Sequence, residues 1–171
     1  TVACAVPKGK RADFLVEKLC ELGAEEFVPL WTARATVDPR VRPDNHVAKW
    51  RRAVVEASKQ CGRRRLMRIA EPVDFMSFLG RVAAFAAGWV CMPSETGAGL
   101  GGAAGAGPRL VVVGPEGGLD PAEEAAALAA GLRPLSLGRT ILRVETAAVA
   151  ALGRVLFESA RQPLQEGWGK M

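Results

Sequence analysis

Two short segments hold the residue types best suited to chemistry, and each follows a run of apolar residues. Gly114–Leu119 (GPEGGL) follows Leu110–Val113, and Leu137–Ala148 (LGRTILRVETAA) begins where Pro134–Leu137 ends. If the apolar runs are strands, both segments lie at the carboxyl ends of strands, where open α/β sheets bind their ligands. The sequence therefore predicts a binding site built from these two segments.

The first segment is rich in glycine. Gly114, Gly117 and Gly118 let the backbone turn sharply and approach a ligand closely. Their spacing differs from GxGxxG, so an ordinary dinucleotide-binding fold is not indicated. A tight turn from a strand into a helix would use the same residues, and the segment alone does not decide between a binding loop and a structural turn.

The second segment places charged groups beside a predicted helix start. Arg143 and Glu145 flank that start, and Thr146 lies next to two alanines that permit close packing. A guanidinium can stabilise an anion and a carboxylate can accept a proton, so the pair could serve catalysis. An exposed Arg–Glu surface pair is the alternative interpretation.

Composition excludes several classes of protein. The chain has 171 residues, of which 49% are hydrophobic, enough for one domain with a sizeable core. No apolar run approaches the roughly 18 residues of a membrane span. His46 is the single histidine, and the four cysteines (Cys4, Cys20, Cys61 and Cys91) form no CxxC pair. We therefore expect no metal site and no Ser-His-Asp hydrolase, and we expect buried thiols in a reducing compartment.

Positive charge is concentrated in the first part of the chain. Residues 8–68 carry 15 Lys and Arg against 8 Asp and Glu, whereas residues 69–171 carry 8 against 10. This asymmetry favours an anionic partner, nucleic acid above all, although a solvated basic surface would look the same. The expected RNA-contacting residues are Lys8, Lys10, Arg11, Arg51, Arg52, Lys59, Arg63, Arg64 and Arg65.

Apolar periodicity predicts alternating strands and helices. Strands are expected at Val2–Val6, Phe27–Trp31, Leu66–Ala70, Ala84–Cys91, Leu110–Val113 and Pro134–Leu137. Helices are expected at Ala12–Leu22, Trp50–Cys61, Asp74–Leu79, Asp120–Ala130 and Val144–Ala160. Asp120, Pro121 and Glu123 have the spacing of a capping box. Residues 38–45 and 97–107 are expected to be loops. The predicted fold class is α/β, with a mostly parallel sheet sandwiched by helices.

Several motifs in this order resemble one known family. They include KGKR near the start, QCGR at the end of the second expected helix, VGPEGGLDPAEE and LSLGRTILRVETAA. The chain resembles the bacterial 16S ribosomal RNA (uracil-N3)-methyltransferases of the SPOUT class, with the match running nearly from end to end. The resemblance implies an α/β knot fold with a C-terminal trefoil knot, S-adenosylmethionine as cofactor, a cytoplasmic homodimer and small-subunit ribosomal RNA as partner. It also implies that residues 1–171 are the catalytic domain, without the N-terminal β-barrel domain usual in the family.

The resemblance further implies which residues form the site. The cofactor would be bound by Pro93, Glu95, Gly114, Pro115, Glu116, Gly117, Gly118, Leu135, Leu137, Gly138, Ile141, Leu142, Arg143, Thr146 and Ala147. Arg143 would stabilise the uracil anion, and Glu145 or Glu116 would take or orient the N3 proton. The sequence leaves the roles of the two glutamates open. It also leaves open a SPOUT enzyme acting on another nucleotide, or an RNA-binding module that has lost catalysis.

Overall fold

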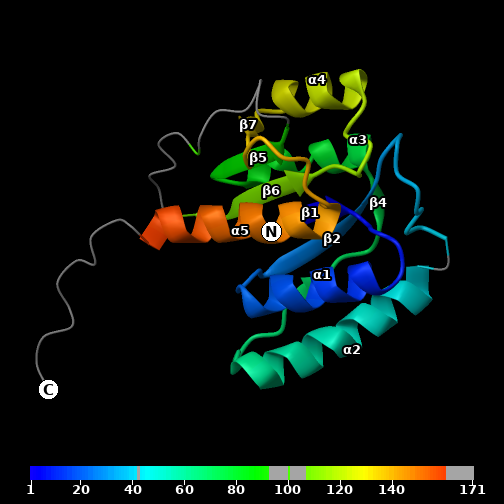
Figure 1. Cartoon of the computed structure of the whole chain (residues 1–171), viewed down its shortest axis with the longest axis vertical. Helices are drawn as coiled ribbons and strands as arrows, with labels where there is room; N and C mark the ends of the chain where they lie inside the picture. The colour runs from blue at the N-terminus through cyan, green and yellow to red at the C-terminus, as the bar shows by residue number, and fades with distance from the viewer. Residues whose placement is uncertain (42, 93–99, 101–106, 161–171) are drawn as a thin grey trace, which may run out of the picture.

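A single parallel sheet forms the centre of the protein (Figure 1). The computed structural model describes residues 1–41, 43–92, 100 and 107–160. The strands are β1 (Val2–Ala5), β2 (Glu26–Trp31), β3 (Arg68–Ile69), β4 (Val73–Asp74), β5 (Ala87–Cys91), β6 (Arg109–Val113) and β7 (Arg133–Leu135). The helices are α1 (Lys10–Glu21), α2 (Pro43–Cys61), α3 (Phe75–Leu79), α4 (Pro121–Ala129) and α5 (Val144–Ala160), with a 3₁₀ turn at Val82–Ala84.

Strand order differs from chain order at the middle of the sheet. The order is β3-β2-β1-β6-β5-β7, with β4 also paired to β2, and all the pairings described are parallel. β6 is thus inserted between β1 and β5, which makes the first strand of the chain a central one. Because all these strands run the same way, their carboxyl ends meet at one edge of the sheet.

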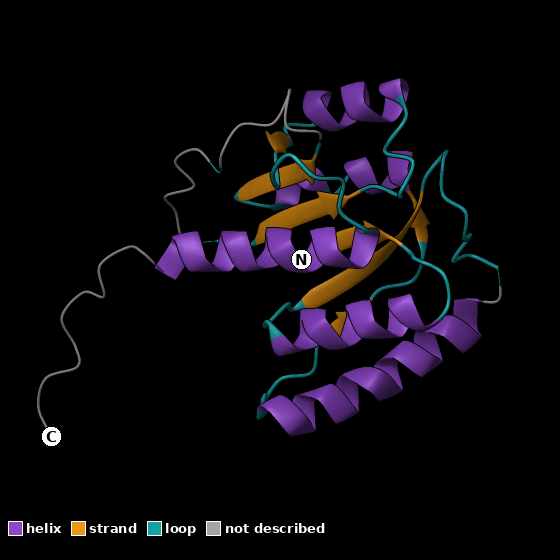
Figure 2. Cartoon of the chain, viewed as in Figure 1, coloured by secondary structure: helices purple, strands orange, loops and turns teal. Residues whose placement is uncertain are grey.

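Successive side chains of the buried strands point to opposite faces of the sheet and pack into two hydrophobic cores, one on each face. Val2 and Cys4 of β1 join the core under α1, α2 and α5, whereas Ala3 between them joins the core under α3 and α4. Figure 2 shows the resulting three layers, with helices above and below the strands. The predicted α/β class is therefore confirmed.

α5 returns the chain to the middle of the sheet. It follows β7 at the sheet edge, yet it packs against β1, β6 and α1. The small apolar residues of this helix, including Ala147, Ala148 and Ala151, allow a close approach to the strands. The trefoil knot implied by the family resemblance stays a prediction.

Some element boundaries differ from the sequence-based expectation. α2 begins at Pro43, in a stretch that the sequence pattern assigned to a loop, because proline is well tolerated in a first helical turn and Asp44 favours the helix amino end. β3 covers only Arg68–Ile69 of the expected strand. The start of the strand expected at Ala84 is occupied by the 3₁₀ turn. The capping box of α4 is confirmed, with Asp120 accepting from the Glu123 amide and Glu123 accepting from the Asp120 amide.

Candidate active site

The carboxyl ends of four neighbouring strands converge on one region. Cys4 at the end of β1 pairs with Val113 at the end of β6, and Cys91 at the end of β5 pairs with Leu135 at the end of β7. The segments that leave β5, β6 and β7 therefore start side by side. Residues far apart in the sequence are brought together here by strand pairing alone.

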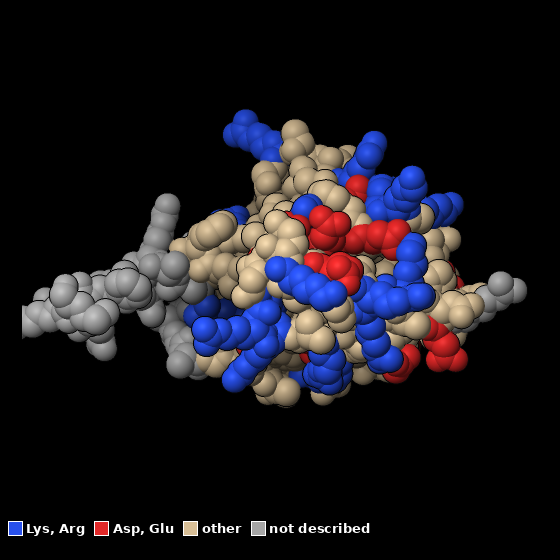
Figure 3. Space-filling model, turned by 90° about the horizontal axis from the view of Figure 1, so that it is seen from below, with Lys and Arg blue, Asp and Glu red and all other residues tan. Residues whose placement is uncertain are grey.

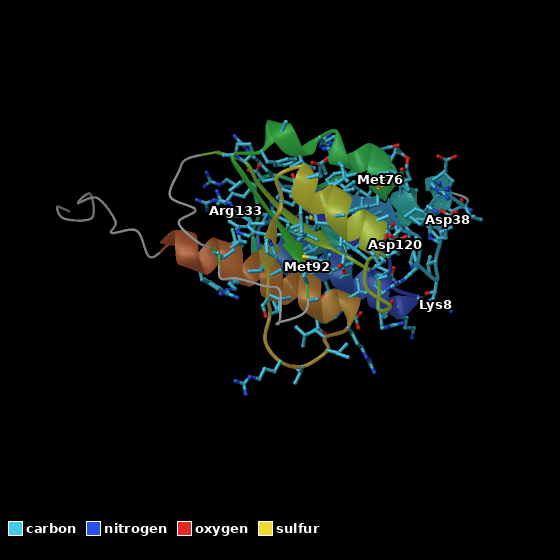
Figure 4. The ribbon with its side chains drawn as sticks, turned by 90° about the horizontal axis from the view of Figure 1, so that it is seen from above. Lys8, Asp38, Met76, Met92, Asp120 and Arg133 are labelled. Carbon is cyan, nitrogen blue, oxygen red and sulfur yellow. The ribbon has the colours of Figure 1, made fainter. Side chains whose placement is uncertain are left out.

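A pocket of about 540 Å³ opens between these segments. Its lining residues are Arg34, Cys91, Met92, Val113, Gly114, Pro115, Glu116, Gly117, Gly118, Leu119, Glu124, Leu137, Gly138, Arg139, Thr140, Ile141, Leu142, Val144 and Ala147. Figure 4 shows Met92 between α4 and α5. The volume falls in the range of pockets that hold cofactor-sized ligands, which is roughly 300–1,000 Å³.

The Gly114–Leu119 segment forms a tight turn on one side of the pocket. The Gly118 amide donates to the Pro115 carbonyl at 2.9 Å, and Gly118 has a φ of +71°, a conformation that favours glycine. Arg34, which follows β2 and also borders the pocket, holds this turn: its Nη1 donates to the carbonyls of Gly117 at 3.1 Å and Leu119 at 3.2 Å. The turn is thus fixed in position by a residue distant in the sequence.

Arg34 is itself held near the start of α4. The neighbouring Ala33 amide donates to Glu123 Oε1 at 2.8 Å, and Glu123 is buried. One carboxylate therefore completes the cap of α4 and ties down the segment that carries Arg34. This arrangement fixes the start of α4 relative to the segment that follows β2.

The loop from Ser136 to Arg143 forms the other side of the pocket. Its start is fixed by Arg154 of α5, whose Nη1 donates to the Ser136 carbonyl at 2.6 Å. Gly138 has a φ of +116°, so the backbone turns where a side chain would be strained. Ile141 is 96% exposed although it borders the pocket. The loop thus offers backbone groups and apolar side chains to a ligand.

Two carboxylates and one guanidinium meet near the ends of β1 and β6. Arg11 of α1 donates from Nη1 to Glu116 Oε1 at 3.0 Å, and the same nitrogen lies 3.9 Å from Glu145 Oε2. Glu116 is exposed, whereas Glu145 is only 6% exposed and its Oε2 has no hydrogen-bond partner within the described structure. The two glutamates that the sequence could not separate therefore occupy very different environments.

Two thiols lie at the same strand ends. Burial raises the pKa of the Cys91 thiol to about 12. Burial also raises the pKa of the Cys4 thiol, with further contributions from Cys91, Glu116 and Glu145. Both thiols are therefore protonated near neutral pH and unsuited to nucleophilic attack. No group of three or more potential metal ligands was found among the described residues.

Most of the predicted cofactor residues line the pocket, but not all. Leu135 is fully buried, while Arg143 and Thr146 are exposed beyond the pocket lining. Pro93 and Glu95 lie outside the described residues. The pocket-lining residues that were not predicted are Arg34, Cys91, Met92, Val113, Leu119, Glu124, Arg139, Thr140 and Val144. The rule that ligands bind at carboxyl strand ends could have found Arg34, Cys91 and Met92, because they follow or end the strands expected to finish at Trp31 and Cys91.

The basic residues occupy several different environments. Figure 3 looks onto the side where α2 is outermost and shows Lys and Arg side chains over much of it, with acidic ones among them. Arg52, Arg64 and Arg65 are exposed, and so are Lys8, Lys10, Arg51 and Lys59. Arg51 pairs with Glu71, and Lys59 pairs with Glu56. Arg63 differs, because its Nη1 donates to the carbonyls of Cys20 at 2.6 Å and Ala24 at 2.8 Å, near the end of α1.

The sequence model of a known domain covers almost all of this structure. The model, described as an RNA methyltransferase domain, matches residues 1–156. The chain belongs to the RNA methyltransferase domain family. This match agrees with the resemblance that the motifs indicated, and it places the pocket within a methyltransferase fold. No helix among the described residues is long and apolar enough to cross a membrane.

Individual curated relatives are also RNA methyltransferases by name. The chain is 35% identical to ribosomal RNA small subunit methyltransferase E of Synechocystis over 91% of its own length and 52% of that protein's. It is 37% identical to the enzyme of the same name in Mycobacterium tuberculosis, over 91% of this chain and 62% of the relative. The chain therefore spans little more than half the length of these curated relatives.

A solved structure shows the same fold. The protein from Neisseria gonorrhoeae, described as ribosomal RNA small subunit methyltransferase E bound to S-adenosyl methionine, superposes with a TM-score of 0.83 at 28% identity. The match covers 92% of this chain and 65% of that one. The parallel sheet and its helices are thus those of a known RNA methyltransferase structure.

Proposed function

We propose that this domain transfers a methyl group from S-adenosylmethionine to N3 of a uridine in small-subunit ribosomal RNA. The observation that carries the proposal is the pocket of about 540 Å³ between the Gly114–Leu119 turn and the 136–143 loop. It lies in a domain whose relatives are named ribosomal RNA small subunit methyltransferase E. The similar structure from Neisseria gonorrhoeae is described as bound to S-adenosyl methionine. We also expect the reaction to take place in the cytoplasm.

The pocket suits this cofactor chemically. Leu137 and Leu142 offer apolar surface for an adenine ring, and the backbone of the 136–143 loop offers N–H and C=O groups to its edge. Glu145 lies in the chain between Val144 and Ala147, which line the pocket, and its buried Oε2 has no hydrogen-bond partner within the described structure. A donor of a bound ligand would satisfy such an acceptor. When bound, the cofactor supplies a sulfonium-linked methyl group, so the reaction needs alignment and a deprotonated acceptor rather than a metal.

The protein groups have separate tasks in this proposal. Glu145 or Glu116 takes the N3 proton of the uracil, and Arg143 stabilises the negative charge on the uracil oxygens. With the cofactor bound in the pocket, its methyl group would pass to the N3 nitrogen, and S-adenosylhomocysteine would remain. Arg143 is exposed beside Val144, which borders the pocket, so its guanidinium is accessible to a large substrate. No cysteine is needed, in agreement with the protonated thiols of Cys4 and Cys91.

The proposal also includes a homodimer. Phe157 near the end of α5 is 67% exposed, and Ile141 in the loop before that helix is 96% exposed. A partner that packed on this end of the molecule would remove both side chains from water, as happens where an apolar surface patch is an interaction site. Light scattering at micromolar protein should give twice the monomer mass, and a monomer mass would contradict this part of the proposal.

Product analysis tests the function. The protein should be incubated with S-adenosylmethionine carrying a labelled methyl group and with small-subunit ribosomal RNA, and the digested RNA analysed by mass spectrometry. N3-methyluridine is the expected product, and Arg143→Ala should abolish it. A methyl group on a ribose or another base would instead indicate a different SPOUT activity. RNA binding with no methylation by the wild-type protein would indicate a module without catalysis.

A further inference from the structure

Arg11 contacts two carboxylates of the protein, whereas a side chain that binds phosphate needs no such contacts. Its place in the basic part of the sequence predicted an RNA contact, yet in the structure its Nη1 faces two carboxylates that border the predicted site. The residue lies in the first turn of α1, shortly after the carboxyl end of β1. Its guanidinium is therefore at the ligand-binding edge of the sheet.

The two carboxylates come from different segments. Glu116 belongs to the turn after β6, and Glu145 to the first turn of α5. Arg11 Nη1 lies 3.0 Å from an oxygen of Glu116 and 3.9 Å from Oε2 of Glu145. One side chain on α1 thus lies between the glycine turn on one side of the pocket and the start of α5, which follows the 136–143 loop.

The environment of Glu145 makes this cation important. The carboxylate is 6% exposed, and its Oε2 has no hydrogen-bond partner in the part of the chain that the structure describes. Burial disfavours a carboxylate anion unless a positive charge or hydrogen-bond donors compensate. The groups around it include the thiol of Cys4, which is neutral, and the acidic Glu116, which contacts the same Arg11 nitrogen. Arg11 supplies a positive charge 3.9 Å from this carboxylate and thereby compensates its burial.

We propose that Arg11 is a positioning residue for methyl transfer, which places a positive charge beside the buried Glu145 and fixes Glu116 and its glycine turn against α1. This inference rests on the proposed function, because it assigns a task to a carboxylate that accepts the uracil proton. Arg11 acts through the two glutamates and does not hold RNA phosphate. Removal of its charge therefore impairs the chemical step while RNA affinity is retained.

Three variants distinguish this role from the alternatives. Arg11→Gln removes the charge, and Arg11→Lys restores a cation without the guanidinium. Lys18→Gln is a matched control, because Lys18 is a cation of the same helix that also pairs with two glutamates, Glu17 and Glu21, away from the pocket lining. Thermal unfolding of each variant establishes that it is folded.

The measurements are kcat, KM for RNA, RNA affinity across salt, and affinity for S-adenosylhomocysteine. Arg11→Gln should lower kcat by about one to two orders of magnitude. The KM for RNA should stay at its wild-type value, because Arg11 acts on the chemical step. Arg11→Lys should recover part of the lost kcat, and Lys18→Gln should resemble the wild type. RNA affinity and its salt dependence should be unchanged in all three.

Two results would overturn the proposal. If Arg11→Gln weakens RNA binding and flattens its salt dependence with kcat unchanged at saturating RNA, Arg11 contacts phosphate. If Arg11→Gln loses only thermal stability, with kcat unchanged at a temperature where the variant is folded, the contact is structural. A wild-type protein that transfers no methyl group would count against the proposed function instead. In that case, hydrogen exchange at the Gly117 and Gly118 amides would still test whether Arg11 fixes the glycine turn through Glu116. We expect this exchange to be faster in Arg11→Gln.

Discussion

The guanidinium of Arg34 donates a hydrogen bond to the Gly117 carbonyl at 3.1 Å, across 83 positions of sequence. The same nitrogen also reaches the Leu119 carbonyl, so two carbonyls of the glycine turn are held by one side chain. A turn of three glycines would otherwise sample many conformations. Arg34 therefore pre-organises the turn before any ligand binds.

Arg34→Ala should weaken the binding of S-adenosylhomocysteine by about tenfold, because the loop must then be ordered at the moment of binding. Isothermal calorimetry measures the effect. Arg40→Ala is the control, since Arg40 is an exposed arginine of the same segment whose hydrogen bonds go to Asp38 rather than to the turn. Equal affinities for the two variants would show that the turn keeps its shape without Arg34.

Substitutions at Gly117 and Gly118 should affect different quantities: ligand affinity at Gly117 and the free energy of unfolding at Gly118. A Cβ on Gly117 would meet the Arg34 Cβ at 3.6 Å, an ordinary contact, so Gly117→Ala should fold normally and lose cofactor affinity where a ligand approaches the backbone. Gly118→Ala should cost about 1 kcal/mol of unfolding free energy, because its φ of +71° is strained for alanine. Urea unfolding and calorimetry separate the two effects. Unchanged ligand affinity in Gly117→Ala would mean that the turn is only structural.

The reactivity of each cysteine should depend on the exposure and the pKa of its thiol. The thiolate is the reactive form, so a raised pKa leaves a thiol protonated and slow to react at pH 8. Iodoacetamide should therefore modify the exposed Cys61 first and leave Cys4 and Cys91 unmodified. Reactivity of Cys91 should rise only as the pH approaches about 12, to the extent that the fold survives. Peptide mass mapping checks this order, and early labelling of Cys91 at pH 8 would contradict it.

Exposed arginines of and beyond α2 should supply RNA affinity. Replacing Arg51, Arg52 and Arg64 together with alanine should weaken RNA binding and reduce the slope of log affinity against log salt by roughly 0.7 to 0.9 for each phosphate that is no longer neutralised. Affinity for S-adenosylhomocysteine should not change, because none of the three lines the pocket. Filter binding across a salt series measures both quantities. A wild-type slope would show that this surface is merely solvated.

Arg63→Ala provides a contrasting variant for the same series. Because Arg63 donates to carbonyls of Cys20 and Ala24, its removal should lower the unfolding free energy by about 1–3 kcal/mol, with little effect on the salt slope. A normal stability combined with weaker RNA binding would restore Arg63 to the RNA-contacting set.

The sequence by itself determined the features that depend on neighbours in the chain. Apolar periodicity located most of the strands and helices, although not β4 or the first turns of α2, and Asp120 and Glu123 formed the expected capping box. The glycines of the Gly114–Leu119 segment predicted a turn, either a binding loop or a structural one, and this turn borders the pocket. These features are governed by local backbone geometry and by which face of an element is apolar. The motifs also indicated the family that the domain match bears out.

The tertiary structure decided which distant segments and side chains lie next to each other. Insertion of β6 between β1 and β5 is a pairing of distant segments, and it brings Cys4, Cys91 and the glycine turn to one edge. Local pattern carries no information on such pairings, so the roles of Arg34 and Arg11 could not be read from their positions in the chain. The same reason explains why Glu116 and Glu145 looked equivalent in sequence. Only the packing of α1 and α5 on the central strands leaves one carboxylate exposed and buries the other.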